Sequence, residues 1–140
     1  MTALIAVAGA TSVNTAEVAY GAITETEPAR IAAMERSETE SVVRDYFKDI
    51  PILSEIARCE SHFRHTLADG TILKGKVDTA DTGVMQINKR YHGIKAAELS
   101  LNLENLQDNL AYARYLYGKQ GTKPWKASSA CWGKTLALSR

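Results

Sequence analysis

Cys59-Glu60-Ser61-His62-Phe63 and Asp81-Thr82-Gly83-Val84-Met85-Gln86-Ile87-Asn88 are the two stretches that decide the expected fold of this chain. The first places one glutamate and a serine at the end of a helical apolar pattern. The second places a glycine, apolar residues, a glutamine and an asparagine beyond a hairpin-like stretch. A lone acid at a helix end, facing a wall of hydrogen-bonding residues, suits the protonation of a glycosidic oxygen.

The residues before and between these stretches predict a helix followed by a hairpin. Apolar residues recur at helical spacing up to Glu60, so we expect a helix that ends near residues 60–62. Its buried face is formed by Ile52, Leu53, Ile56, Ala57 and Cys59. Asp69-Gly70 is a strong turn signal between residues 63–67 and 72–73, and a second strand-like piece covers residues 74–77.

Helical patterns on both sides predict a mainly α domain, of the α+β kind, with a small β-hairpin insert. One helix is expected over Val42, Val43, Tyr46, Phe47 and Ile50. Asp49 is the expected N-cap of the helix that begins at Pro51. The chain is expected to be helical again from Gln86, or else to form a strand that leads to a helix N-cap at Asn88. A long helix is expected over Leu103, Leu106, Leu110, Ala113 and Tyr117, closing at Gly118 or Gly121, before a loop or short helix from Pro124 to Trp132.

Length and composition predict one domain with a real core. The chain has 140 residues, of which 45% are hydrophobic, and its 17 basic and 16 acidic residues leave a net charge of +1. No basic run interleaved with aromatic residues occurs, which argues against nucleic acid as a partner. Cys59, His62 and His65 have helical spacing but no obvious fourth ligand, so we expect no metal site.

The N-terminal part, residues 1–41, is expected to be an apolar segment followed by a linker, with the globular domain over residues 42–140. The alternative to the linker is an independent amphipathic segment, with the start of a short helix over residues 29–34 after Pro28 and few contacts with the rest. Residues 2–10 are uncharged and mostly small and apolar, like the central region of a secretory signal. They lack the usual basic residues before them and a clean cleavage site after them. A truncated signal is the favoured interpretation, and a loose apolar tail is the alternative. The run is too short to span a bilayer, so we expect no stable membrane insertion.

Glu-Ser followed by Gly-Val-Met-Gln-Ile-Asn resembles the lysozyme superfamily, in particular its soluble lytic transglycosylase (SLT) domain, with c-type lysozyme as a near relative. The resemblance covers roughly residues 42–134. It implies a lysozyme-like fold and cleavage of the β-1,4 bond between N-acetylmuramic acid and N-acetylglucosamine in the peptidoglycan glycan strand. It implies no cofactor, with Glu60 as the catalytic acid and base. Substrate contacts are expected from Ser61, Gln86, Asn88 and Tyr91.

The residues around Glu60 and Gly83 suit this chemistry on their own. Apolar neighbours and the partial negative charge of a helix end both raise the pKa of a glutamate, as a general acid near neutral pH requires. The alternative is an ordinary exposed glutamate at a helix end. Gly83 would let the backbone approach a sugar, and Gln86 can donate and accept hydrogen bonds to it.

Asp81 is the second candidate catalytic residue, and it separates the enzymatic hypotheses. In c-type lysozymes a second carboxylate occupies this place, and retaining glycosidases use one about 5 to 5.5 Å from the acid. SLT-type enzymes lack it and use the C6 hydroxyl of the substrate, which yields a 1,6-anhydro sugar. We favour the transglycosylase. A hydrolytic lysozyme is the alternative, and a non-catalytic glycan-binding module is a third hypothesis.

Two features concern the C-terminal region. The SLT segment Ala-Tyr-Asn-Ala-Gly, whose tyrosine contacts the catalytic glutamate, is missing here. The sequence therefore does not identify the group that orients Glu60. Cys59 before the acid and Cys131 after a Pro-Trp segment are similar to the resuscitation-promoting-factor branch, where the two cysteines are bridged. The alternative is two buried free thiols. The bridge implies a secreted or cell-envelope protein, which we expect to be a monomer.

Overall fold

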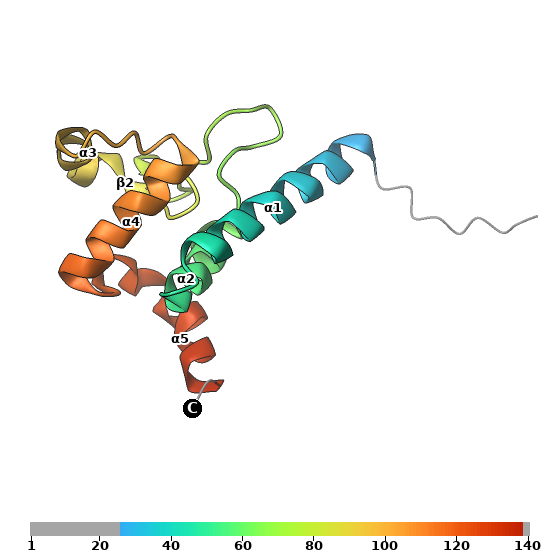
Figure 1. The fold of residues 1–140 in the computed structure, drawn as a ribbon. Coiled ribbons are helices and arrows are strands. Elements are labelled where there is room, and N and C mark those ends of the chain that lie inside the picture. The colour runs from blue at the N-terminus through green and yellow to red at the C-terminus, as the bar shows by residue number, and fades with distance from the viewer. Residues whose placement is uncertain (1–25, 139–140) are drawn as a thin grey trace, which may run out of the picture.

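The computed structural model describes residues 26–138, and most of its chain is helical (Figure 1). The helices are α1 (Glu27–Tyr46), α2 (Pro51–Ser61), α3 (Lys89–Glu98), α4 (Leu106–Gln120) and α5 (Ser129–Leu138), with a short 3-10 helix η1 (Lys123–Ser128) before α5. The strands β1 (Asp81–Thr82) and β2 (Ile87–Asn88) form a two-stranded antiparallel sheet. The expected mainly α class is therefore confirmed. The apolar segment at residues 2–10 lies outside the described residues.

Helix α1 runs across the expected boundary between residues 41 and 42. It begins at Glu27, with Pro28 in its first turn, and continues to Tyr46. The segment expected to be a linker is rich in Ala, Glu, Arg and Met, which favour helix even where little packs against it. Figure 1 shows the first half of α1 extending away from the other helices, and Ile31 and Met34 are exposed there.

Helix α2 occupies the predicted place, but its N-cap was predicted wrongly. The N-cap residue is Ile50, and no side chain caps the first turn. Asp49 instead pairs with Arg114 of α4, whose guanidinium nitrogens lie 2.7 and 2.9 Å from its carboxylate oxygens. This hydrogen bonding lowers the pKa of Asp49 to about 2. A partner so far along the chain was not visible in the local sequence.

The hairpin insert forms as short bridges. The turn at Asp69-Gly70 is confirmed, since Gly70 has a φ of 79° and Thr66 pairs with Ile72 across it. Lys74 then pairs with Thr82, which places the second strand-like piece beside β1. A strand precedes α3, and the side chain of Asn88 accepts a hydrogen bond from the backbone N–H of Arg90. The prediction of an Asn88 N-cap is thus confirmed, whereas a helix starting at Gln86 was wrong.

The core lies where α1, α2 and α4 meet the segment between β1 and β2. Val84 and Met85 of that segment are fully buried, and the indole N–H of Trp125 donates to the Met85 carbonyl at 3.0 Å. Helix α4 ends at Gly121, where a φ of 60° favours glycine, as predicted. Other large core side chains that are fully buried include Val43, Phe47, Leu53, Ile56, Leu110 and Tyr112.

Buried Asn109 of α4 fastens the β1–β2 segment to the helices. Its amide nitrogen donates to the carbonyls of Thr82 and Leu103 at 3.0 and 2.8 Å, and its amide oxygen accepts from the Met85 backbone N–H at 3.0 Å. Backbone groups in this segment would otherwise be buried without partners. No helix among residues 26–138 is long and apolar enough to cross a membrane.

Candidate functional site

Glu60 lies in the last turn of α2, where the chain reverses direction. The next two residues that follow α2, His62 and Phe63, both have left-handed φ values, 52° and 58°. The reversal leaves the Glu60 carboxyl half-buried, facing the end of η1. The Ser128 hydroxyl donates to Glu60 Oε1 at 2.6 Å. The Ser128 oxygen accepts from the Trp132 indole N–H at 3.1 Å and also lies 3.1 Å from the Trp125 carbonyl, so its contact with Glu60 is the shortest of the three.

Ser128 was missed by the sequence interpretation. Its hydroxyl is the side-chain group that donates a hydrogen bond to the Glu60 carboxyl. No local pattern distinguishes it from Ser129, which follows it. Only its position relative to the neighbouring Trp132 and to the distant Glu60 reveals the role.

The pKa of Glu60 is raised above its ordinary value. Burial of the carboxyl raises the pKa most, the hydrogen bond from Ser128 lowers it, and the negative charge of Asp81 raises it again. The upward direction was expected from the apolar neighbours. The contribution of Asp81, from a different element, was not. Glu60 is therefore suited to hold a proton at a pH where an exposed glutamate has lost it.

Two adjoining cavities of about 310 Å³ each meet at Glu60 and share Glu60, Asp81 and Gln86 as lining residues. Together they form one groove with the acid at its middle. We call one side the aromatic arm, which is further lined by Tyr91, His92, Gln120, Pro124 and Trp125 among others. We call the other side the basic arm, which is further lined by His62, Arg64, Leu73, Lys74, Lys76 and Val77 among others.

Asp81 lines the groove and also accepts a hydrogen bond from a neighbouring side chain. Its Oδ1 accepts from the Asn88 side-chain amide at 2.8 Å, and the same amide nitrogen donates to Asp78 at 2.9 Å. Asn88 thus joins two aspartates of the insert to the start of α3. Asp81 and Asn88 both line the groove, and the Asn88 amide nitrogen is engaged by Asp78 and Asp81.

The other predicted substrate contacts divide into two groups. Gln86 lies at the junction of the two arms, where its side-chain amide donates to the Gly83 carbonyl at 2.8 Å. Tyr91 lines the aromatic arm and is 74% exposed. Ser61, however, is 1% exposed, and its hydroxyl donates to the Ala57 carbonyl inside α2. Ser61 supports the helix end and lines neither arm of the groove.

Gly83 serves the interior and not the groove, which corrects the expected role. Its φ is 72°, and a Cβ there would lie 2.7 Å from the His65 ring and 2.8 Å from the Asn109 amide. His65 is buried, and burial lowers the pKa of its ring. The His65 Nδ1 accepts from the Val84 N–H at 3.2 Å, while Nε2 donates to the Glu104 carbonyl at 2.9 Å. This polar layer fixes the wall opposite Glu60.

The disulfide between Cys59 and Cys131 is present, as the resemblance implied. It joins α2 to α5 with a Cα–Cα distance of 6.0 Å. Cys59 directly precedes Glu60, and Cys131 lies within one helical turn of Ser128. The bond therefore fixes the two segments whose contact orients the acid.

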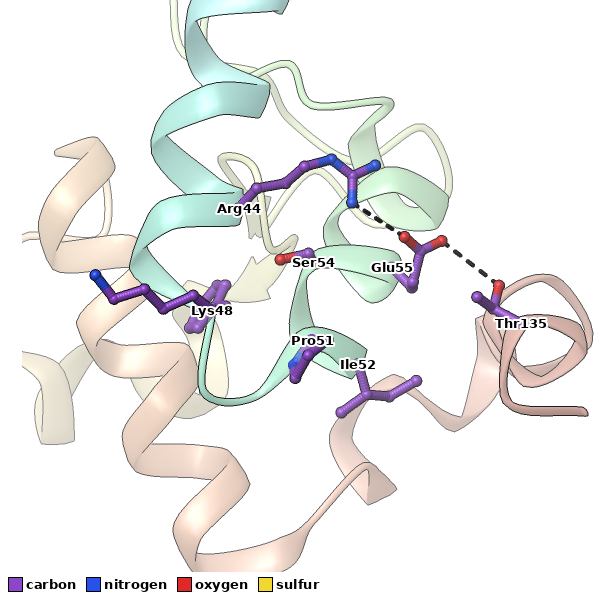
Figure 2. Close-up of a pocket in the computed structure, with 8 residues that line it drawn as sticks. Arg44, Lys48, Pro51, Ile52, Ser54, Glu55 and Thr135 are labelled. Carbon is purple, nitrogen blue, oxygen red and sulfur yellow. Dashed lines mark hydrogen bonds and ion pairs between the residues drawn. The ribbon is translucent and has the colours of Figure 1, made fainter. Parts of the chain in front are cut away.

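A further cavity of about 350 Å³ lies between α1, α2 and α5, as Figure 2 shows. Its carboxylate, Glu55, is paired with Arg44 at 3.2 Å and with Arg58 at 2.9 Å. Burial raises the pKa of Glu55, but the hydrogen bonds from Arg58 and Arg44 outweigh it, and the pKa is lowered overall. The pKa values of Glu55 and Glu60 are thus shifted in opposite directions, and the groove at Glu60 is the better candidate for a site that needs a protonated carboxyl.

Comparison of the chain with protein-family models, curated proteins and solved structures found no match. The assignment of a function therefore rests on the groove and on the motifs around Glu60 and Gln86.

Replacing the two polar neighbours of Glu60 is expected to move its pKa in opposite directions. Ser128→Ala removes a donor to the carboxylate and raises the pKa, whereas Asp81→Asn removes a like charge and lowers it. Carboxyl-carbon NMR titration of Glu60 measures both shifts, with Ser129→Ala as the matched control that leaves the pKa unchanged. Shifts of the same sign in the two variants would contradict this account of the site.

Proposed function

We propose that this protein cleaves the β-1,4 glycosidic bond between N-acetylmuramic acid and N-acetylglucosamine in peptidoglycan, with Glu60 as the proton donor. The observation that carries the proposal is a half-buried glutamate with a raised pKa at the middle of a groove. A linear glycan strand needs a site that continues on both sides of the bond to be cleaved. The groove extends on both sides of Glu60, which lies where the aromatic arm and the basic arm meet.

The favoured reaction is that of a lytic transglycosylase. Glu60 gives its proton to the glycosidic oxygen as the bond to the anomeric carbon breaks. The resulting Glu60 carboxylate then takes the proton of the C6 hydroxyl of the same muramic sugar, whose oxygen attacks the anomeric carbon. The product is a 1,6-anhydro sugar, and Glu60 is protonated again. The Val-Met-Gln-Ile core, which resembles the SLT motif, and the half-buried Glu60 with its raised pKa support this reaction.

A hydrolytic lysozyme is the second candidate, and the position of Asp81 favours it. Asp81 lines the groove beside Glu60, close enough for its charge to raise the pKa of the acid. A carboxylate in that place stabilises an oxocarbenium-like centre or attacks it, after which water releases a reducing sugar. A glycan-binding module without turnover, the third hypothesis, would need no raised pKa at Glu60.

We propose further that the protein acts in the cell envelope or outside the cell, as a monomer. The disulfide supports export, because such bonds persist in oxidising compartments. Peptidoglycan, the proposed substrate, lies in that location.

Glu60→Gln is expected to abolish release of muropeptides from purified sacculi while leaving the melting temperature near that of the parent, because the amide keeps the shape and loses the proton. Glu98→Gln is the matched control, since Glu98 is an exposed glutamate at the end of α3, outside the groove. Release by Glu60→Gln at the parent rate would rule out the proposed acid.

Asp81→Ala is expected to retain substantial activity and to yield anhydro-muropeptides, because the C6 hydroxyl replaces the second carboxylate. Asp78→Ala is the matched control, since Asp78 shares the hydrogen bond from Asn88 but does not line the groove. Mass analysis of the released muropeptides identifies the product. If Asp81→Ala lost several orders of magnitude in cleavage rate while Asp78→Ala did not, and the products had reducing ends, the hydrolytic alternative would be established instead.

A further inference from the structure

We infer that the basic arm of the groove binds carboxylates carried by the glycan strand, so that the two arms take chemically different parts of the substrate. This inference rests on the proposed function and extends it to the substrate's charge. The observation that carries it is the unequal distribution of charge on the two sides of Glu60.

The two arms differ in their ionisable side chains. Apart from the three shared residues, the lining of the aromatic arm contains no lysine, arginine, aspartate or glutamate. The corresponding lining of the basic arm contains Arg64, Lys74 and Lys76, together with His62, and no acid. Both arms have a similar volume and adjoin the same Glu60, so the difference between them is charge and not size.

Arg64 and Lys76 are the cations available to a ligand. Lys76 is exposed, and none of the carboxylates among residues 26–135 pairs with it. The Arg64 Nε donates to the Ser61 carbonyl at 3.1 Å, which orients the guanidinium at the end of α2 without neutralising it. Arginine held in this way presents its other nitrogens to a carboxylate at little further cost in side-chain entropy.

Lys74 is already paired with a carboxylate, which limits the proposal to the other two cations. Its Nζ lies 3.0 Å from Glu104 Oε1, and Lys89 pairs with the same oxygen at 3.0 Å. These hydrogen bonds, from Lys89 and then Lys74, lower the pKa of Glu104 to about 2. The nearby Asp78 is likewise occupied, because it accepts from Asn88 and pairs with Arg90. It is therefore not free to compete for Lys76.

The chemistry of peptidoglycan supplies carboxylates on one of its two sugars. N-acetylglucosamine is neutral, whereas the lactyl group of N-acetylmuramic acid ends in a carboxylate or carries a peptide stem with acidic residues. A strand lying along the groove can place such a group against Arg64 and Lys76 while neutral sugar faces Tyr91 and Trp125 in the aromatic arm. The shared chemistry is the carboxylate, and its two sources are the free lactyl group and the peptide stem.

Binding measurements on the Glu60→Gln protein test the inference without turnover. Three probes of equal sugar length are compared by titration calorimetry at low salt: a neutral chitin oligosaccharide, a peptide-free muramic-acid oligosaccharide and a peptide-bearing one. Lys76→Glu and Arg64→Ala are made in this background. Lys134→Glu is the matched control, because Lys134 lies in α5 outside both arms and the charge change is the same.

Lys76→Glu is expected to weaken the binding of an anionic probe about fivefold or more and to leave the binding of chitin unchanged. Added salt is expected to weaken the binding of the anionic probes to the protein that keeps Lys76 and Arg64. Loss confined to the peptide-bearing probe identifies the peptide carboxylates, loss confined to the peptide-free muramic-acid probe identifies the lactyl carboxylate, and loss with both shows that the basic arm binds either source. The inference would be overturned if Lys76→Glu and Arg64→Ala bound the anionic probes as tightly as Lys134→Glu does. It would also be overturned if the affinity for chitin fell as much as the affinity for the anionic probes. Failure of the proposed cleavage would appear separately, as intact sacculi with the unmutated protein.

Discussion

The contact between the end of α2 and the start of α5 is the constraint on which the rest of the site depends, and the Cys59–Cys131 bond holds it. The bond closes a loop with a sequence separation of 72 residues, which corresponds to roughly 4 kcal/mol of chain-entropy stabilisation. That loop contains the hairpin insert, both strands, α3 and α4. Its closure brings the Ser128 hydroxyl to the Glu60 carboxyl, and thereby sets the orientation and part of the pKa of the acid.

The opposite wall of the groove is held by buried polar groups. His65 and Asn109 bond the backbone around Gly83, Val84 and Met85, so the strands carry Asp81 and Gln86 at a fixed distance from α2. Leaving such backbone groups unpaired would cost about 1–3 kcal/mol each. The site is therefore supported from both sides, by a covalent bond behind Glu60 and by a polar layer behind the strand wall.

Local patterns predicted much of the fold and the raised pKa of Glu60, and long-range contacts account for what they missed. The end of α2 at Ser61, the turn at Gly70 and the cap at Asn88 each have a short sequence signature, and all three are present. Ser128 and Asn109 have none, because their partners lie far along the chain. The burial of Ser61 follows from how α2 packs, and the ion pair of Asp49 follows from where α4 lies. Neither can be predicted from the residues that neighbour Ser61 or Asp49 in the sequence.

The most direct test of the claim that Glu60 is the proton donor compares two pKa values from one protein. A general acid must be protonated, so kcat/KM falls as the pH rises through the pKa of Glu60 in the free enzyme. The account predicts that the midpoint of this fall matches the pKa of Glu60 from NMR titration, above its ordinary value of 4.5, and that Ser128→Ala raises both together. A kinetic midpoint that stays in place while the NMR pKa of Glu60 moves would contradict the account.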